Sequence, residues 1–208
     1  TKHMHIPDGF LDPVTALITY TLSLIYAAYA FYNVKKNKKS EEIVLASVLA
    51  AGIFAAQMLN WPLPGGTSLH FVGGALAGIL LGPWLGFISV FLVLLVQCLV
   101  FHDGGITTLG ANVLNMAILD VLIGYIFYKI FPEKYKMLGV FLGGWLGITI
   151  AGIACGIELG FSGQFPYSLQ STVLVMGTWH ALLGLIEGAI TSAVVNYIVK
   201  KAPHVMMR

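Results

Sequence analysis

The chain has 208 residues, of which 58% are hydrophobic and only 10% are charged, and its mean hydropathy is +0.86. Ordinary soluble domains carry about 25% charged residues, so this composition excludes that class and indicates an integral membrane protein. The small net charge of +2 does not indicate a nucleic-acid partner.

Apolar stretches divide the chain into potential membrane spans, since about 20 apolar residues can cross a bilayer as a helix. Basic clusters or turns rich in glycine and proline separate them. The sequence predicts an all-α integral membrane protein, one domain over residues 1–208, with seven transmembrane helices: Pro13–Tyr32, Glu41–Leu59, Ser68–Gly82, Trp84–Phe101, Ala111–Ile130, Met137–Leu159 and Leu174–Val199. Two prolines and two glycines favour a structured loop between Asn60 and Ser68.

The basic residues predict the orientation of these helices, because lysine and arginine gather on the cytoplasmic side of membrane proteins. Of the 11 Lys and Arg residues, all except Lys2 follow the first or seventh helix or flank the loop between the fifth and sixth. Seven crossings place these three regions on one side. We therefore expect the N-terminus outside and the C-terminus in the cytoplasm, with His5, His102 and the loops 60–68 and 161–170 on the outer face.

The first residues show no basic region followed by an apolar one, so no signal peptide is predicted. Thr1, Lys2 and His3 look like an expression remnant, which makes Met4 the expected native first residue. The amine of Met4, the deprotonated amide nitrogen of His5 and the near imidazole nitrogen of His5 could then chelate one metal ion. A chain starting at Thr1 would offer a similar donor set that ends at His3.

His70 could add a fourth nitrogen to the chelate at Met4 and His5. Four nitrogens in a plane suit Ni(II), Cu(II) or Co(II) better than Zn(II), which prefers a tetrahedron. The alternative interpretation is that the N-terminal residues form a loose tail and that His70 caps a helix end.

Several polar residues lie within or beside the predicted spans, where ionisable groups are costly. The ionisable ones are Asp120, Glu158, His180 and Glu187. Candidates to orient the ligating imidazoles are Gln57, Asn60, Asn112 and Asn115. We expect His102 and His180 to be hydrogen-bonded histidines near the membrane interface. For Asp120 and Glu187, internal polar contacts or contacts with a partner on the inner side are expected.

An enzymatic function is not supported. A hydrolytic site could in principle combine Ser68, His70, His102 and Asp103. However, the chain has neither a Gly-x-Ser-x-Gly elbow nor a His-Glu-x-x-His helix. It also lacks a phosphate-binding loop, so energy for uphill transport would come from another subunit. Cys98 and Cys155 each lie inside an apolar run, which argues against a paired cysteine metal site.

Four segments resemble one known family: residues 4–11 (MHIPDGFL), 66–70 (GTSLH), 73–84 (GGALAGILLGPW) and 102–112 (HDGGITTLGAN). They are similar to the CbiM/NikM family, the substrate-binding (S) components of energy-coupling-factor (ECF) transporters for cobalt and nickel. The start MHIPDG carries most of the specificity, and the small-residue helix motifs carry little.

The resemblance implies the S-component fold with one additional N-terminal helix, located in a prokaryotic cell membrane. It implies that Met4, His5 and His70 bind Ni2+ or Co2+ at the outer face, as cargo and without an organic cofactor. Further pocket candidates are His3, Asp8, Asn60, Ser68, His102 and Asn112. If residues 1–3 are present, the Met4 amine becomes a peptide nitrogen, so metal binding would weaken or use His3 instead.

The resemblance also implies partners. These are the coupling transmembrane subunit, two ABC-type ATPase subunits and, in some systems, a small accessory membrane subunit. Ala46 and Ala50 look like the alanine pair with which S components dock onto the coupling subunit. The competing hypothesis is a self-sufficient cation channel or secondary transporter, although the halves of the chain show no convincing repeat.

Overall fold

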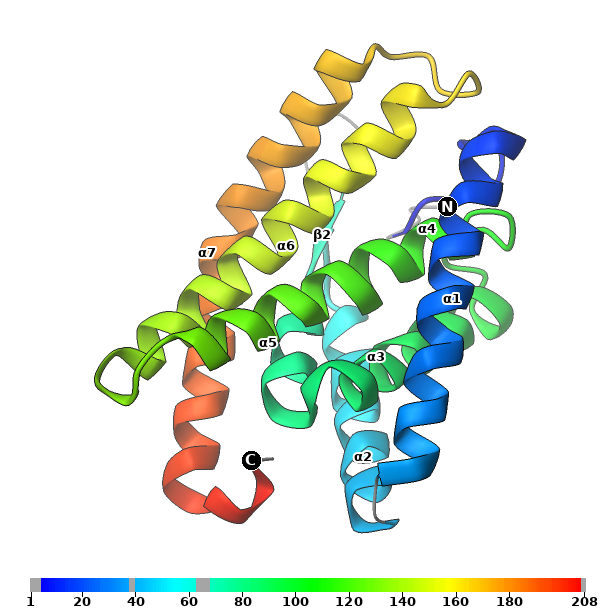
Figure 1. Cartoon of the computed structure of the whole chain (residues 1–208). Coiled ribbons are helices and arrows are strands. Elements are labelled where there is room, and N and C mark those ends of the chain that lie inside the picture. The colour runs from blue at the N-terminus through cyan, green and yellow to red at the C-terminus, as the bar shows by residue number, and fades with distance from the viewer. Residues whose placement is uncertain (1–4, 38–39, 63–67, 207–208) are drawn as a thin grey trace.

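The computed structural model describes residues 5–37, 40–62 and 68–206. Along the chain the elements are α1 (Pro13–Asn37), α2 (Ser40–Gln57), β1 (Asn60–Pro62), β2 (Ser68–His70), α3 (Gly74–Val100), α4 (Leu109–Asn112), η1 (Val113–Asp120), α5 (Val121–Ile130), η2 (Glu133–Tyr135), α6 (Lys136–Phe161), α7 (Leu169–Lys201) and η3 (Pro203–Val205). Figure 1 shows the start of α1 and the α6–α7 connection at one end of the bundle, and the last turns of α1 and α7 at the other.

Among the described residues, six helical segments are long and apolar enough to cross a membrane, with α4, η1 and α5 forming one of them over Leu109–Ile130. The predicted count of seven transmembrane helices is not confirmed by this count of long helices. The predicted third and fourth helices correspond to the two parts of α3, which is interrupted at Gly82, where the sequence predicted the boundary between them. The part of α3 before Gly82 rises only about 12 Å at ~1.5 Å per residue, so as a helix it is too short to cross a bilayer.

Gly82 turns the chain sharply because its φ of 77° and ψ of 179° are not helical. The left-handed φ favours glycine, and Pro83 begins the second part of α3. The two parts lie against each other: a Cβ at Gly86 would be 2.8 Å from the Ala77 carbonyl oxygen. In a straight helix these residues would be about 13 Å apart.

The predicted start of the third helix at Ser68 is also wrong, because residues 68–70 form β2, which pairs antiparallel with β1. The chain then runs on without helical structure through Phe71–Gly73 before α3 begins at Gly74. Phe71 and Val72 are buried. The predicted third helix is therefore an extended segment, residues 68–73, followed by the short first part of α3.

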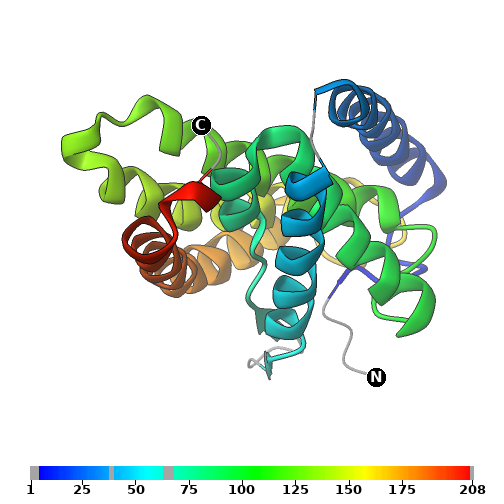
Figure 2. The ribbon, with the colours of Figure 1, turned by 90° about the horizontal axis from the view of Figure 1, so that it is seen from below.

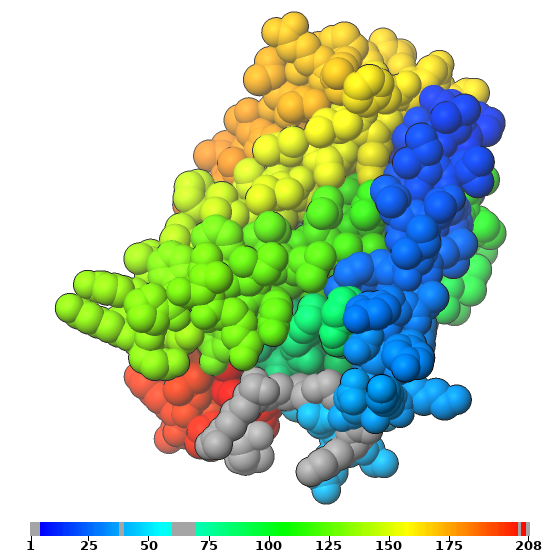
Figure 3. All heavy atoms as spheres, viewed as in Figure 1, coloured from blue at the N-terminus to red at the C-terminus, as the bar shows by residue number. Residues whose placement is uncertain are grey.

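Helix α1 lies along the outside of the bundle, as the view in Figure 2 and the spheres in Figure 3 show. Only a narrow face of small or short side chains is buried: Thr19, Ser23, Ala30 and Val34. The Ser23 hydroxyl donates to the Gly110 carbonyl across this contact, at 2.7 Å. The small face lets the backbones approach closely, while the large apolar residues of α1 remain exposed to the surroundings.

Helices α1 and α7 are longer than predicted. Helix α1 continues to Asn37 and includes Lys35 and Lys36, whose long side chains can reach the membrane surface from a helix end. Helix α7 begins at Leu169 because Ser168 caps it, with its side chain accepting from the Ser171 N–H. Hydropathy alone does not detect such a cap.

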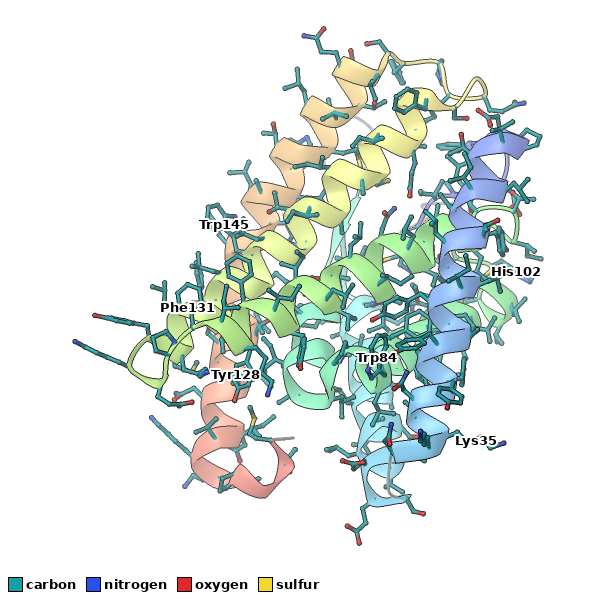
Figure 4. All side chains as sticks on the ribbon, in the orientation of Figure 1. Lys35, Trp84, His102, Tyr128, Phe131 and Trp145 are labelled. Atoms are coloured by element: carbon teal, nitrogen blue, oxygen red, sulfur yellow. The ribbon has the colours of Figure 1, made fainter. Side chains whose placement is uncertain are left out.

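The lysines of the helix ends lie at the end of the bundle opposite the N-terminus. Lys35 and Lys36 lie in the last turn of α1, and Lys200 and Lys201 in the last turn of α7. Figure 4 shows Lys35 near the lower end of α1, away from the terminus labelled N in Figure 1. The structure therefore gives the molecule one basic end.

We expect Gly78→Ala to destabilise the protein, because an added Cβ would lie only 2.1 Å from the Val121 carbonyl oxygen. Overpacking of this kind costs about 1–3 kcal/mol. Thermal unfolding in detergent measures the effect. Gly52→Ala is the matched control, since it is also helical and a Cβ there meets nothing within 4 Å. Equal unfolding temperatures for the two variants would contradict the close packing of α3 on α5.

Candidate metal-binding site

The N-terminal segment is held against the chain that follows α3. The Ile6 N–H donates to Asn112 Oδ1 at 3.1 Å, and the Gly105 N–H donates to the Ile6 carbonyl at 2.9 Å. The His5 N–H points at Asp103 Oδ1, 3.4 Å away. His5 and Ile6 are buried, so in the described part of the chain this segment is a packed element and the predicted alternative of a loose tail is wrong from His5 onward.

Asp8 fastens the same segment a few residues later. Its Oδ1 accepts from the Thr107 N–H at 2.7 Å and from the Thr107 hydroxyl at 2.5 Å. These bonds to the charged form lower the pKa of Asp8 from its ordinary value. The carboxylate is therefore ionised at neutral pH and can accept both bonds.

Two further bonds join the N-terminal segment to the α6–α7 connection. The Asp12 N–H donates to Ser162 Oγ at 2.9 Å, and the Ser162 hydroxyl donates to the Phe10 carbonyl at 2.8 Å. Asp12 also caps α1 by accepting from the Thr15 N–H at 2.9 Å. The segment thus bridges three parts of the bundle at the end opposite the basic residues.

His5 and His70 meet at this end. Their ring centroids are 5.0 Å apart at an interplanar angle of 81°, and the two residues are only 6% and 7% exposed. His70 Nδ1 lies 2.9 Å from the Phe71 carbonyl. Because a carbonyl can only accept, Nδ1 of His70 carries the proton and Nε2 carries the lone pair that a metal would use.

The other ring, that of His5, contacts Gln97, a residue that is not part of any predicted metal-ligand or pocket set. His5 Nε2 lies 2.8 Å from Gln97 Oε1, and the buried Nδ1 of His5 has no hydrogen-bond partner among the described residues. Burial lowers the pKa of His5, although Asp103 and Gln97 act in the opposite direction. The imidazole is therefore neutral at pH 7, the form that binds metals. The one signal for Gln97 was a polar residue in an otherwise apolar run.

The structure places the predicted pocket residues in different environments. Asn112 and Asp8 hold the N-terminal segment, as described above. Asn60 pairs with His70 in the β1–β2 hairpin and Ser68 with Pro62, by backbone register. His102 is exposed, with a φ of 55°, at the turn that follows α3 (Figure 4). His3 and Met4 lie outside the described residues.

Ala46 and Ala50 are buried inside the protein, at 5% and 9% exposure. The Ser89 hydroxyl of α3 donates to the Ala46 carbonyl at 3.1 Å. In this structure the alanine pair packs α2 against α3 and does not form an exposed surface. Its role in docking the coupling subunit stays a prediction.

Three of the four ionisable residues at membrane depth, Glu158, His180 and Glu187, form hydrogen bonds inside the protein. Glu187 Oε2 accepts from the Val72 N–H at 3.0 Å and Oε1 from the Gly73 N–H at 2.7 Å. Asn115 Nδ2 donates to Glu158 Oε2 at 2.7 Å, and His180 Nδ1 bonds the Met176 carbonyl at 2.7 Å. Asp120 is fully buried, and a Cβ at Gly147 would be 2.1 Å from its Oδ1.

Within residues 5–37, 40–62 and 68–206, no group of three or more His, Cys, Asp or Glu side chains could hold a metal ion. A metal at His5 and His70 would therefore need additional donors, such as backbone or terminal nitrogens. The fold and this histidine pair define a multi-pass membrane protein with a nitrogen-rich site at one end.

Comparison with known proteins agrees with this class. Residues 5–205 match the model of the family described as "CbiM: Cobalt uptake substrate-specific transmembrane region". An inferred fused nickel transport protein, NikMN, of Archaeoglobus fulgidus is 55% identical over 98% of this chain and 68% of its own length. The cobalt transport protein CbiM of Thermosipho melanesiensis is 32% identical over 95% of this chain and 87% of its own.

The crystal structure of a transition metal transporter superimposes with a TM-score of 0.89 at 35% identity, covering 95% of this chain and 93% of that one. The chain therefore belongs to the CbiM/NikM family, the cobalt- and nickel-uptake transmembrane components of ECF transporters. Membership makes it a multi-pass membrane protein of prokaryotic metal uptake and implies a transport role rather than an enzymatic one.

We expect Asp8→Ala to loosen the N-terminal segment, because both bonds from Thr107 are lost. Hydrogen exchange of a peptide covering residues 5–11 should become at least about tenfold faster, since local opening governs exchange. Asp8→Asn is the matched control, because its amide oxygen can still accept from Thr107. Unchanged exchange in Asp8→Ala would mean that Asp8 does not fasten this segment.

Proposed function

We propose that this chain captures Ni2+ or Co2+ at the outer face of the membrane and delivers it as the substrate-binding component of an ATP-driven ECF transporter. The observation that carries the proposal is the contact of two buried imidazoles, His5 and His70, with ring centroids 5.0 Å apart. They come from segments far apart in the sequence. Two buried imidazoles in contact offer nitrogen donors that suit a late transition metal.

The donor set in this proposal is the Met4 amine, the amide nitrogen and Nδ1 of His5, and the His70 imidazole. Nδ1 is the near ring nitrogen of His5, the one that closes a chelate ring with its own amide nitrogen, and it is buried without a partner in the part of the chain that the structure describes. The His5 N–H points at Asp103 Oδ1, an acceptor for the proton that the metal would displace. Four nitrogens in this arrangement favour a planar Ni(II) or Co(II) complex.

In the proposed membrane orientation, the histidine pair faces the outside of the cell and the basic end of the bundle faces the cytoplasm, because lysines gather on the cytoplasmic side. In this topology the extended residues 68–73 and the first part of α3 together make one crossing, so the six long helices of the structure give seven passes. The metal would then enter from the outside and leave towards the cytoplasm when the bundle reorients on its partners. ATP hydrolysis by the partner ATPases would supply the energy.

We expect His5→Ala and His70→Ala, each in a chain that begins at Met4, to weaken Ni2+ binding by at least about 100-fold, more than loss of an orienting partner does. His180→Ala is the matched control, because His180 bonds within α7. Isothermal titration in detergent measures the affinities. The chain with residues 1–3 should bind more weakly than the one starting at Met4. Equal losses in all three alanine variants would place the site elsewhere.

We expect 63Ni uptake by cells to require the coupling subunit and both ATPase subunits together with this chain. Replacement of the lysine in the phosphate-binding loop of the ATPases should reduce uptake to background, because the partner subunits can then no longer hydrolyse ATP. Uptake by the chain alone at a similar rate, unaffected by depletion of ATP, would contradict the proposal and favour a self-sufficient channel or secondary transporter.

A further inference from the structure

Two buried glutamines connect the His5 ring to the middle of the bundle. Gln97 of α3 and Gln57 of α2 are both 0% exposed. Gln57 Nε2 donates to the Val72 carbonyl at 2.6 Å, Gln97 Nε2 donates to Gln57 Oε1 at 2.9 Å, and Gln97 Oε1 lies 2.8 Å from His5 Nε2. Each contact leads to the next, so these residues form a continuous hydrogen-bonded chain.

The direction of this chain is fixed at its inner end. The Val72 carbonyl can only accept, so the amide NH2 of Gln57 must face it and the Gln57 oxygen must face Gln97. The same reasoning turns the NH2 of Gln97 towards Gln57 and its oxygen towards His5. A carbonyl oxygen at 2.8 Å from Nε2 requires that Nε2 carries the proton. A neutral imidazole has one proton, so Nδ1 of His5 holds the lone pair.

The inner end is itself anchored in α7. Val72 donates its N–H to Glu187 Oε2 at 3.0 Å, and Gly73 donates to Oε1 at 2.7 Å. The same extended segment holds the second histidine, because His70 Nδ1 bonds the Phe71 carbonyl at 2.9 Å. One three-residue segment, Phe71–Gly73, therefore orients both imidazoles: one directly and the other through the two glutamines.

We propose that Gln97, oriented by Gln57, is a positioning residue for metal capture that holds His5 in the Nε2–H tautomer and so presents Nδ1 to the cation. The inference rests on the proposed function, since only a metal bound at Nδ1 makes this tautomer matter. Nδ1 is the nitrogen that can close a chelate ring with the His5 amide. The opposite tautomer would carry a proton there and would have to lose or move it before the metal could bind.

The test uses three variants of the chain that begins at Met4. Gln97→Met keeps the approximate length of the side chain and removes the acceptor for His5. Gln97→Glu keeps an acceptor for His5 but cannot donate to Gln57. Gln170→Met is the matched control, because Gln170 is an exposed glutamine at the start of α7. Thermal unfolding establishes that each variant is folded, and Gln57→Met provides a second way to disturb Gln97 if Gln97→Met does not fold.

Two measurements are made on each variant. In the metal-free protein, 15N chemical shifts of the His5 ring report which nitrogen carries the proton. We expect the Nε2–H tautomer in the unsubstituted chain, Gln97→Glu and Gln170→Met, and a mixture of tautomers in Gln97→Met. Titration with Ni2+ should then show about a 10–100-fold loss of affinity in Gln97→Met, as for other residues that orient metal ligands, and substantial recovery in Gln97→Glu.

The inference is overturned if Gln97→Met keeps a single Nε2–H tautomer, or if its affinity falls without a change of tautomer, since the residue would then act only through packing. Failure of the proposed function gives a different result: the unsubstituted chain would not bind Ni2+, while the tautomer measurement on the metal-free protein would still report on Gln97.

Discussion

The structure depends on how Glu187 binds the extended segment before α3. Unpaired backbone groups are costly at membrane depth, so non-helical chain is tolerated there only where the protein satisfies it. The Glu187 carboxylate accepts from the N–H groups of Val72 and Gly73, and Gln57 donates to the Val72 carbonyl. This arrangement lets the chain stay extended between β2 and α3 inside the bundle. It also holds the residues directly after His70 against α2 and α7.

The N-terminal segment is also held in place by hydrogen bonds. A metal-binding residue near a chain terminus needs such support, because a mobile terminus would not keep it beside the other donors. Ile6, Asp8 and Asp12 bond to the chain after α3 and to the α6–α7 connection. These contacts keep His5 buried beside His70 although the two are far apart in the sequence. Rigid support of this kind lowers the entropy that binding would otherwise have to remove.

Helix packing in this protein relies on small residues that contact other helices of the same chain. Ala46 and Ala50 have the spacing expected of a docking surface, yet they pack against α3 within the chain. Gly78 lies on Val121 of α5 in the same way. A small-xxx-small pattern indicates that another helix approaches closely. It does not indicate whether that helix belongs to the same chain.

The sequence by itself determined the membrane class, six of the seven predicted helices to within about five residues, the segregation of the lysines and the two histidines that meet, because hydropathy, charge and motif are local properties. Only the tertiary structure decided that the third helix begins at Gly74 and not at Ser68, that Phe71–Gly73 is extended, and that Gln97 contacts His5. Each of these depends on hydrogen bonds or steric contacts between residues far apart in the chain. A local sequence pattern does not show which distant residue a side chain will contact. The sequence around Gln97 therefore shows only a polar residue in an apolar run, and its contact with His5 is visible only in the folded structure.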